Sequence, residues 1–312
     1  MRKYLPETIL ATALLLLAGA DLLTGGGSIS VPSEAVFLKL RLPRLLTALI
    51  AGGALSLCGV QMQSIFRNPL ADPHIMGISS GAGLGAAIAV AAGGTAAWSL
   101  AGGALAGAFL TAAAVMAVSF RIRSATTVLL TGVMTGFILS AATSVIQYRV
   151  SEQGLKVIYS WASGNFAGND TTGILVMAGA SVIGLAIALS IRKGLDILLF
   201  GEEFATLSGA PVKRIRLSAI LSCCLMCAAV TAFCGPIGFV GIVAPHVART
   251  LTGSSVHSRI IPSGIMSGAI ICIAADIISS LSSVPLPSGS AVAFIGIPLI
   301  LFAMLSQRVQ YA

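Results

Sequence analysis

The fold class follows from one polar stretch, residues 192–216, with the sequence RKGLDILLFGEEFATLSGAPVKRIR. The chain has 18 basic and 10 acidic residues, and eight of these 28 charged residues lie in this stretch. Because hydrocarbon does not accommodate charge at that density, the stretch must lie in water beside a membrane. It is either a solvated loop or a surface on which a soluble partner docks.

Local chemistry gives this stretch a shape. Residues 202–208 are good helix formers, with Phe204 and Leu207 on one face, and Gly209-Ala210-Pro211 is typical of a turn. We therefore expect a short amphipathic helix, a bend and a basic return into the membrane.

Composition sets the class of the whole chain. Of its 312 residues, 56% are hydrophobic and 9% are charged, with a mean hydropathy of +0.99. These values are typical of an all-α polytopic membrane protein. The 35 glycines fit close packing of membrane helices. We expect a single transmembrane domain over residues 1–312, with a cytoplasmic loop at about residues 192–216.

The apolar runs predict about ten spans. They cover residues 8–23, 42–66, 74–92, 95–120, 124–148, 171–191, 215–234, 238–251, 259–281 and 290–306. The run 74–92 is rich in small residues and is expected to be an irregular or partial span, and residues 25–39 are expected to form a loop. The first run also resembles a signal peptide, with Ala18-Gly19-Ala20 as the cleavage pattern, although a retained helix is favoured.

Basic residues predict the orientation. Ten spans put 13 of the 18 Lys and Arg residues on one side and five on the other, so the richer side is cytoplasmic. The 13 are Arg2, Lys3, Arg67, Arg121, Arg123, Arg192, Lys193, Lys213, Arg214, Arg216, Arg249, Arg259 and Arg308, and the five are Lys39, Arg41, Arg44, Arg149 and Lys156. Both termini and the loop at 192–216 are then cytoplasmic.

Several motif searches argue against a catalytic or metal site on this chain. No G-x-x-x-x-G-K-[ST] motif occurs, so the chain is not its own P-loop ATPase. Residues 77–81, GISSG, match a hydrolase elbow with His74 and His246 at hand, but an all-helical chain lacks the strand that the elbow needs. The six cysteines lie in apolar runs and are expected to be buried small side chains, with no metal site.

Two aspartates in apolar runs leave alternatives open. Asp21 and Asp276 could serve an ion-coupled secondary transporter or an intramembrane protease, or they could simply hydrogen-bond a neighbouring helix.

A series of motifs in fixed order resembles the FecCD-type permeases, the membrane subunits of ATP-driven importers for cobalamin, ferric siderophores and haem. The motifs are RLPR at 41–44, GVQMQ at 59–63, NPLADP at 68–73, GISSGAG at 77–83, LLTGV at 129–133, residues 201–211, GPIGFVGIVAPHVAR at 235–249, AD at 275–276 and GIP at 296–298. The resemblance implies a type II importer permease of ten helices that pairs with itself around a central pathway. It also implies that the chain is not an enzyme and binds no cofactor, because a separate ATPase uses ATP and Mg²⁺.

The resemblance assigns roles to residues. ATPase coupling is implied for Gly201, Glu202, Glu203, Leu207, Gly209, Pro211 and Arg214; docking of a binding protein for Arg41 and Arg44; and a gate on the pathway for Asn68, Leu70, Ser124, Ala125 and Thr126. A third basic docking position of the cobalamin importer corresponds to Ser280 here. The expected partners are a second copy of the chain, two ATPase subunits, a soluble or lipid-anchored binding protein and the lipid of a bacterial cytoplasmic (inner) membrane. No nucleic acid partner is expected.

The outer end of the span at 124–148 bears on the cargo. Arg149 and Lys156 precede Trp161 and Asn165, and we predict that Arg149, Trp161 and Asn165 line the substrate pathway. Positive charge there favours an iron chelate (a ferric siderophore or haem) over neutral cobalamin, unless the two cations face lipid headgroups. Iron chelate is the predicted cargo, and cobalamin is the alternative.

Overall fold

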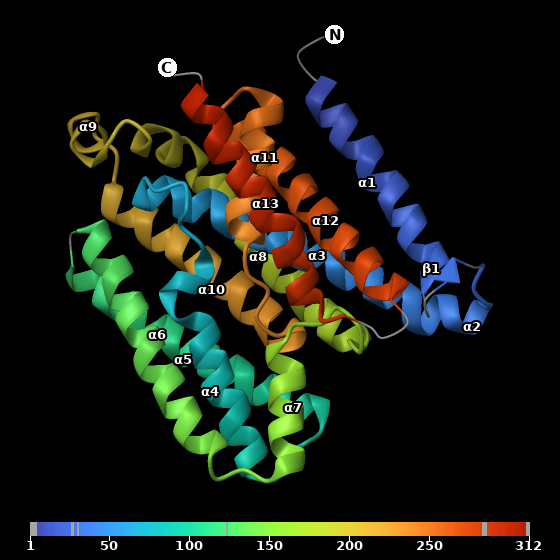
Figure 1. The fold of residues 1–312 in the computed structure, drawn as a ribbon. Coiled ribbons are helices and arrows are strands. Elements are labelled where there is room, and N and C mark those ends of the chain that lie inside the picture. The colour runs from blue at the N-terminus through green and yellow to red at the C-terminus, as the bar shows by residue number, and fades with distance from the viewer. Residues whose placement is uncertain (1–4, 26–27, 30, 123, 283–285, 310–312) are drawn as a thin grey trace.

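The computed structural model describes residues 5–25, 28–29, 31–122, 124–282 and 286–309 as a helical bundle (Figure 1). A two-stranded antiparallel hairpin, β1 (Thr24–Gly25) with β2 (Ser28–Ile29), joins the first helices. The helices are α1 (Leu5–Leu23), α2 (Glu34–Val36), η2 (Phe37–Arg41), α3 (Leu42–Phe66), η3 (Pro73–Met76), α4 (Ile78–Ala91), α5 (Ala97–Arg121), α6 (Ala125–Gln147), α7 (Glu152–Ala162), α8 (Thr171–Leu198), α9 (Glu202–Leu207), α10 (Val212–Cys234), α11 (Val240–Thr252), α12 (His257–Leu281) and α13 (Ser288–Val309).

Within the described residues, seven helical segments are long and apolar enough to cross a membrane. They are α1, the continuous run from α2 to α3, α5, α6, α8, α10 and α12. The other three predicted spans correspond to α4, α11 and α13, of which α4 and the described part of α13 are short and apolar. The all-helical membrane fold expected from the sequence is therefore confirmed.

Helix α3 lies at the centre of the bundle, packed against α8, α10, α11 and α12. From Leu45 to Ile65 nearly every side chain is buried, which explains why this span is apolar on all sides. At Gly59 a Cβ would lie 1.8 Å from the carbonyl oxygen of Gly241 on α11. The two helices thus touch backbone to backbone, which only glycine permits.

Of the loop expected over residues 25–39, the part from Glu34 onward is helical instead. The chain turns helical at Glu34, passes through the π-helical turn η2 and continues without a break into α3. Because Pro43 has no N–H and its ring clashes with an ordinary preceding turn, the wider turn accommodates it.

Three other segments bear on the expectations, and one of these expectations is corrected. Helix α8 continues to Leu198, so Arg192, Lys193 and Asp196 belong to a helix rather than to a loop. The small-residue run after His74 agrees with the partial span expected, since a 3-10 turn is followed by α4, a helix of only 14 residues whose small side chains pack closely on α5. Helix α7 was not expected, since it is too short and too polar to register as a span.

Different elements lie at the two ends of the bundle. The first turn of α1, the last turns of α13 and helix α9 lie at one end, and α7 lies at the other (Figure 1). This arrangement agrees with an even number of spans. Three cations used for the orientation, Arg2, Lys3 and Arg123, lie outside the described residues.

Candidate functional site

The polar stretch forms a projecting knob built around α9. Two glycines with positive φ delimit it: Gly201, at φ 112°, turns the chain after α8, and Gly209, at φ 77°, turns it before α10. Side chains other than glycine rarely adopt these values. The short helix between them confirms the helix expected over residues 202–208.

The knob is anchored to the bundle from inside. Ala205 is fully buried, and Glu202 accepts a hydrogen bond from the guanidinium of Arg216 on α10, whose side chain is 7% exposed. An ion pair with one partner buried holds two elements in a defined relation. The position of α9 is therefore tied to that of α10.

The outer surface of the knob is apolar. Leu207 is 88% exposed, and the rings of Phe200 and Phe204 lie exposed with centroids 5.5 Å apart. Large apolar side chains in a charged, water-facing loop indicate a surface for a protein partner.

The structure brings the predicted coupling residues together on this knob. Gly201 is buried and Glu202 is paired, whereas the other five are exposed. Those five are Glu203, Leu207, Gly209, Pro211 and Arg214. Sequence reasoning missed Phe200, because it ends an apolar run and resembles part of the preceding span.

The predicted gate residues fall into two segments at the same end of the bundle. Asn68 and Leu70 are exposed in the turn after α3, where Asn68 Oδ1 accepts the N–H of Leu70 at 2.9 Å. Ser124 caps α6 and is followed by Ala125 and Thr126. Helix η3, which follows the first segment, packs against α6, which begins within the second. Their role as a gate stays a prediction.

At the opposite end, Arg41 and Arg44 are engaged within the chain. Nε of Arg44 lies 2.8 and 2.7 Å from the two carboxylate oxygens of Asp276, and Nη1 of Arg41 donates to the Leu22 carbonyl at 2.7 Å. Asp276 is 1% exposed, and Arg44 is 21% exposed. The charge expected to meet a binding protein is thus partly neutralised by Asp276.

Asp21 and Asp276 lie beside these two arginines. A cavity of about 270 Å³ is lined by Asp21, Arg41, Arg44 and Asp276, together with Thr24 and other residues. Oδ1 of Asp21 is buried without a hydrogen-bond partner. Ser280, at the third docking position, donates to Thr24 Oγ1 at 3.3 Å. Asp276 therefore has a structural partner, and both aspartates face one polar cavity between α1, α3 and α12.

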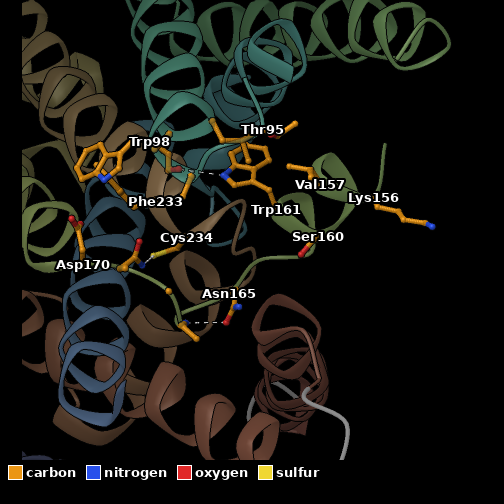
Figure 2. A pocket seen from close by; sticks show the side chains of 17 residues that line it. Thr95, Trp98, Lys156, Val157, Ser160, Trp161, Asn165, Asp170, Phe233 and Cys234 are labelled. Atoms are coloured by element: carbon orange, nitrogen blue, oxygen red, sulfur yellow. Dashed lines mark hydrogen bonds between the residues drawn. The ribbon is translucent and has the colours of Figure 1, made fainter. Parts of the chain in front are cut away.

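A larger pocket lies between α5, α7, α8 and α10, and Figure 2 shows its side chains. Its volume is about 530 Å³, and its wall includes Trp98, Trp161 and Phe233. The ring of Trp98 meets Phe233 edge-on at 5.8 Å, and Trp161 Nε1 donates to the Ala232 carbonyl at 3.2 Å. The pocket is therefore a pre-formed aromatic cleft.

Of the predicted pathway residues, Trp161 and Asn165 line this pocket and Arg149 does not. The main chain of Asn165 is fixed by a 2.8 Å hydrogen bond to the Cys234 carbonyl. Lys156 is at the rim, paired with Glu152 at 3.0 Å, so it adds little net charge. Of the two cations expected near the pocket, Arg149 and Lys156, Arg149 therefore contributes most of the positive charge, and its side chain is exposed.

The remaining candidates, His74 and the six cysteines, are bonded or buried within the fold. His74 bonds both the Ser79 hydroxyl and, at 2.7 Å, the Ile237 carbonyl, so it holds the start of α4 against the segment before α11. All six cysteines are buried and unpaired, as expected. Over the described part of the chain, no group of three or more His, Cys, Asp or Glu side chains could hold a metal ion.

Comparison with known proteins gives a consistent result. The model of the FecCD transport family matches residues 7–306. The vitamin B12 import system permease protein BtuC of Citrobacter koseri is 34% identical over 304 residues, which are 96% of this chain and 92% of that protein. BtuC of Salmonella paratyphi A is also 34% identical, over 301 residues covering 95% and 92%.

Two solved structures have a fold similar to that of this chain. A metal-chelate type ABC transporter in an inward-facing conformation superimposes with a TM-score of 0.87 at 32% identity, covering 95% of this chain and 97% of that one. PsaBC from Streptococcus pneumoniae, solved with a Fab, has a TM-score of 0.56 at 17% identity over 84% of this chain and 90% of that one, a likeness of fold alone.

Proposed function

Because the chain belongs to the FecCD transport family, we propose that it moves a metal chelate, delivered by a binding protein, into the cytoplasm. It is the permease subunit of an ATP-binding-cassette importer, and ATP is hydrolysed by a separate ATPase. In this proposal the ATPase uses ATP and Mg²⁺, while the permease supplies the passage.

The observation that carries the proposal is the exposed apolar surface of α9. Phe204 and Leu207 project from a charged knob, and the ion pair from Glu202 to Arg216 ties the knob to a membrane-spanning helix. A soluble ATPase docked on α9 would therefore displace α10 when it closes on nucleotide. Nucleotide binds the two permease states with different affinity, and this difference supplies the direction of transport.

The charge distribution supports an orientation in a bacterial cytoplasmic membrane with α9 and both termini on the cytoplasmic side. The richer share of basic residues lies with α9. Arg41, Arg44 and the pocket around Trp161 then face outward, where a binding protein would dock and release its cargo. Complementary charge would speed that encounter.

Helix α6 supports pairing with a second copy. Along α6, Phe137 and Ile138 are 66% and 70% exposed, and within this chain few side chains of the helix are buried. A second copy on this face would form a central pathway with the gate residues Asn68, Leu70 and Thr126 at its inner end. Lipid covers the remaining apolar surface in this proposal.

We propose an iron chelate, a ferric siderophore or haem, as the cargo, with cobalamin as the second candidate. The exposed Arg149 favours an anionic chelate. The names of the relatives favour cobalamin, and the pairing of Lys156 with Glu152 weakens the charge argument. Both candidates are large metal chelates, in keeping with the transporter of similar structure.

The test is reconstitution of the chain with its candidate ATPase in liposomes. ATP hydrolysis and uptake are measured with binding protein loaded with ferrichrome, haemin or cyanocobalamin. We expect a stable complex whose ATPase activity rises with one loaded binding protein, which identifies the cargo. Uptake that persists on an ion gradient alone, with no ATPase complex, would contradict the proposal and return attention to Asp21 and Asp276.

A further inference from the structure

Three helices meet in a chain of hydrogen bonds at the end of the bundle that carries α9. Asp196, in the last turn of α8, accepts from both the N–H and Nδ1 of His257, at 2.7 and 2.6 Å. Nε2 of His257 lies 2.8 Å from the hydroxyl of Ser64 on α3. His257 is the first residue of α12, so one side chain joins α8, α12 and α3.

Each bond in this junction has a physical reason. The first N–H groups of a helix have no partner within it, and a carboxylate at the positive end of the helix dipole satisfies one of them. Asp196 therefore caps α12 from another helix. Since an ionised carboxylate only accepts, Nδ1 of the imidazole carries a proton.

The Ser64 hydroxyl completes the junction. It lies 2.8 Å from the Val60 carbonyl as well as from His257, and it has one proton to donate. Either Ser64 donates to the imidazole, or the imidazole donates to Ser64 while Ser64 donates to Val60. Both arrangements connect α12 to α3, and both ends of this bond are 1% exposed, so water does not compete for it.

A second contact lies one residue away on α3. Arg249 of α11 donates to Gln63 Oε1 at 2.5 Å, and Gln63 Nε2 donates to the Gly241 carbonyl at 3.1 Å. Two adjacent residues of α3 thus contact different helices. Gln63 is hydrogen-bonded to α11, and Ser64 is hydrogen-bonded to His257 of α12, which is bonded in turn to α8. The inner end of α3 is the point where these helices are held together.

The junction is close in sequence to the knob. Asp196 precedes Leu198, the last residue of α8, and α9 begins at Glu202. Glu202 is in turn paired with Arg216 of α10, the helix that follows α9. A displacement of α9 therefore has two routes into the bundle, one through Arg216 and one through Asp196.

We propose that His257 is the positioning residue through which movement of α8 and α9 reaches α12 and α3, so that the helices around the pathway move together. This inference rests on the proposed function, because it assumes an ATPase docked on α9. The residue touches no cargo and no nucleotide. Its part is to keep the end of α8 and the start of α12 in register while α9 is displaced.

The variants separate the two arms of the junction. His257→Asn keeps an amide near the position of Nδ1 and so keeps the side-chain bond to Asp196, whereas His257→Gln places its amide near Nε2 and loses that side-chain bond. The bond from the main-chain N–H of residue 257 to Asp196 is kept in both variants. Ser64→Ala removes the bond between α12 and α3, together with the contact of Ser64 to the Val60 carbonyl within α3. Ser267→Ala is the matched control, because Ser267 is also 1% exposed and donates at 2.8 Å to the carbonyl four residues back, Ser263, within its own helix.

The experiment measures cargo taken up per ATP hydrolysed by the complex with the ATPase in liposomes, using whichever of ferrichrome, haemin or cyanocobalamin the unmodified chain transports. We expect His257→Gln to lower this ratio about fivefold or more at an unchanged hydrolysis rate, the lower end of the range for coupling between sites. Ser64→Ala should lower the ratio too, His257→Asn should retain more of it, and Ser267→Ala should leave it unchanged.

The outcomes are distinguishable. If the unmodified chain forms no ATPase complex, the proposed function fails and this inference with it. If the complex forms and transports, but His257→Gln and Ser64→Ala keep the unmodified ratio, only the inference is overturned. Uptake and hydrolysis that fall in equal proportion, together with a loss of folded complex, would make His257 a purely structural residue and would also overturn it.

Discussion

Nε of Arg44 lies within hydrogen-bond distance of both carboxylate oxygens of Asp276, and this contact joins α3 to α12 at the end of the bundle opposite α9. Because Asp276 is 1% exposed and Arg44 is 21% exposed, the pair is largely withdrawn from water. Asp276→Asn removes the carboxylate charge that Arg44 contacts directly. We expect the free energy of unfolding to fall by about 3 kcal/mol, the low end for broken buried pairs because Arg44 keeps some contact with solvent.

Thermal unfolding in detergent measures this loss. The control is Glu152→Gln, which breaks an exposed pair with Lys156 and should cost about 0.5 kcal/mol or less. Equal unfolding temperatures for the two variants would show that Asp276 contributes no more than a surface charge.

Leu207→Glu on α9 should weaken ATPase binding. A central apolar contact residue contributes about 2 kcal/mol or more to an interface, so we expect the Kd to rise about 30-fold. Titration of the purified permease with the ATPase measures it. Thr172→Glu, an exposed residue at the other end of α8, is the control and should not change the Kd.

Gly209→Pro should uncouple ATP hydrolysis from transport. Gly209 has a φ of 77°, whereas proline holds φ at about −65°, so the turn that leads from α9 to α10 must change. We expect cargo moved per ATP to fall about fivefold or more while the ATPase stays bound. Gly93→Pro introduces the same conflict, at φ 90°, in the turn between α4 and α5, and should leave the ratio unchanged.

Gly59→Ala should prevent correct packing of α3. Its methyl group would lie 1.8 Å from the Gly241 carbonyl oxygen, a contact that requires the two helices to separate. Overpacking of this kind costs about 1–3 kcal/mol or more, and we expect lower yield and a lower unfolding temperature. Gly179→Ala, with no atom within 4 Å of the added methyl group, should stabilise α8 by about 0.5–1 kcal/mol. An unfolding temperature for Gly59→Ala equal to that of the unmodified protein would contradict the prediction.

Local chemistry predicted the helices well where their boundaries carry their own signals. Residues 42–66 form α3 as expected, because Arg67-Asn68-Pro69 ends the run with a turn. The end of α8 was misplaced, since its charges lie on a helix that extends beyond the apolar run. Helix α7 had a usable signal, Ser151 as N-cap followed by Glu152, which a search for spans alone passes over.

The candidate sites were predicted as lists of residues, and their partners were not. Sequence placed Arg44 and Asp276 at separate features, but their contact depends on the packing of helices 232 residues apart. The same holds for Asp196 and His257, 61 residues apart. No periodicity or motif encodes such pairings, because they arise only when α3 is enclosed by its neighbours.

The backbone contact between Gly59 and Gly241 restricts how α3 and α11 can move relative to each other. Side chains can slide past one another by changing rotamer, but two main chains in direct contact have no such freedom. Helices α3 and α11 are therefore expected to move as one unit. Few side chains of α6 are buried within this chain, so we expect a change of conformation to shift α6 relative to the joined pair of α3 and α11.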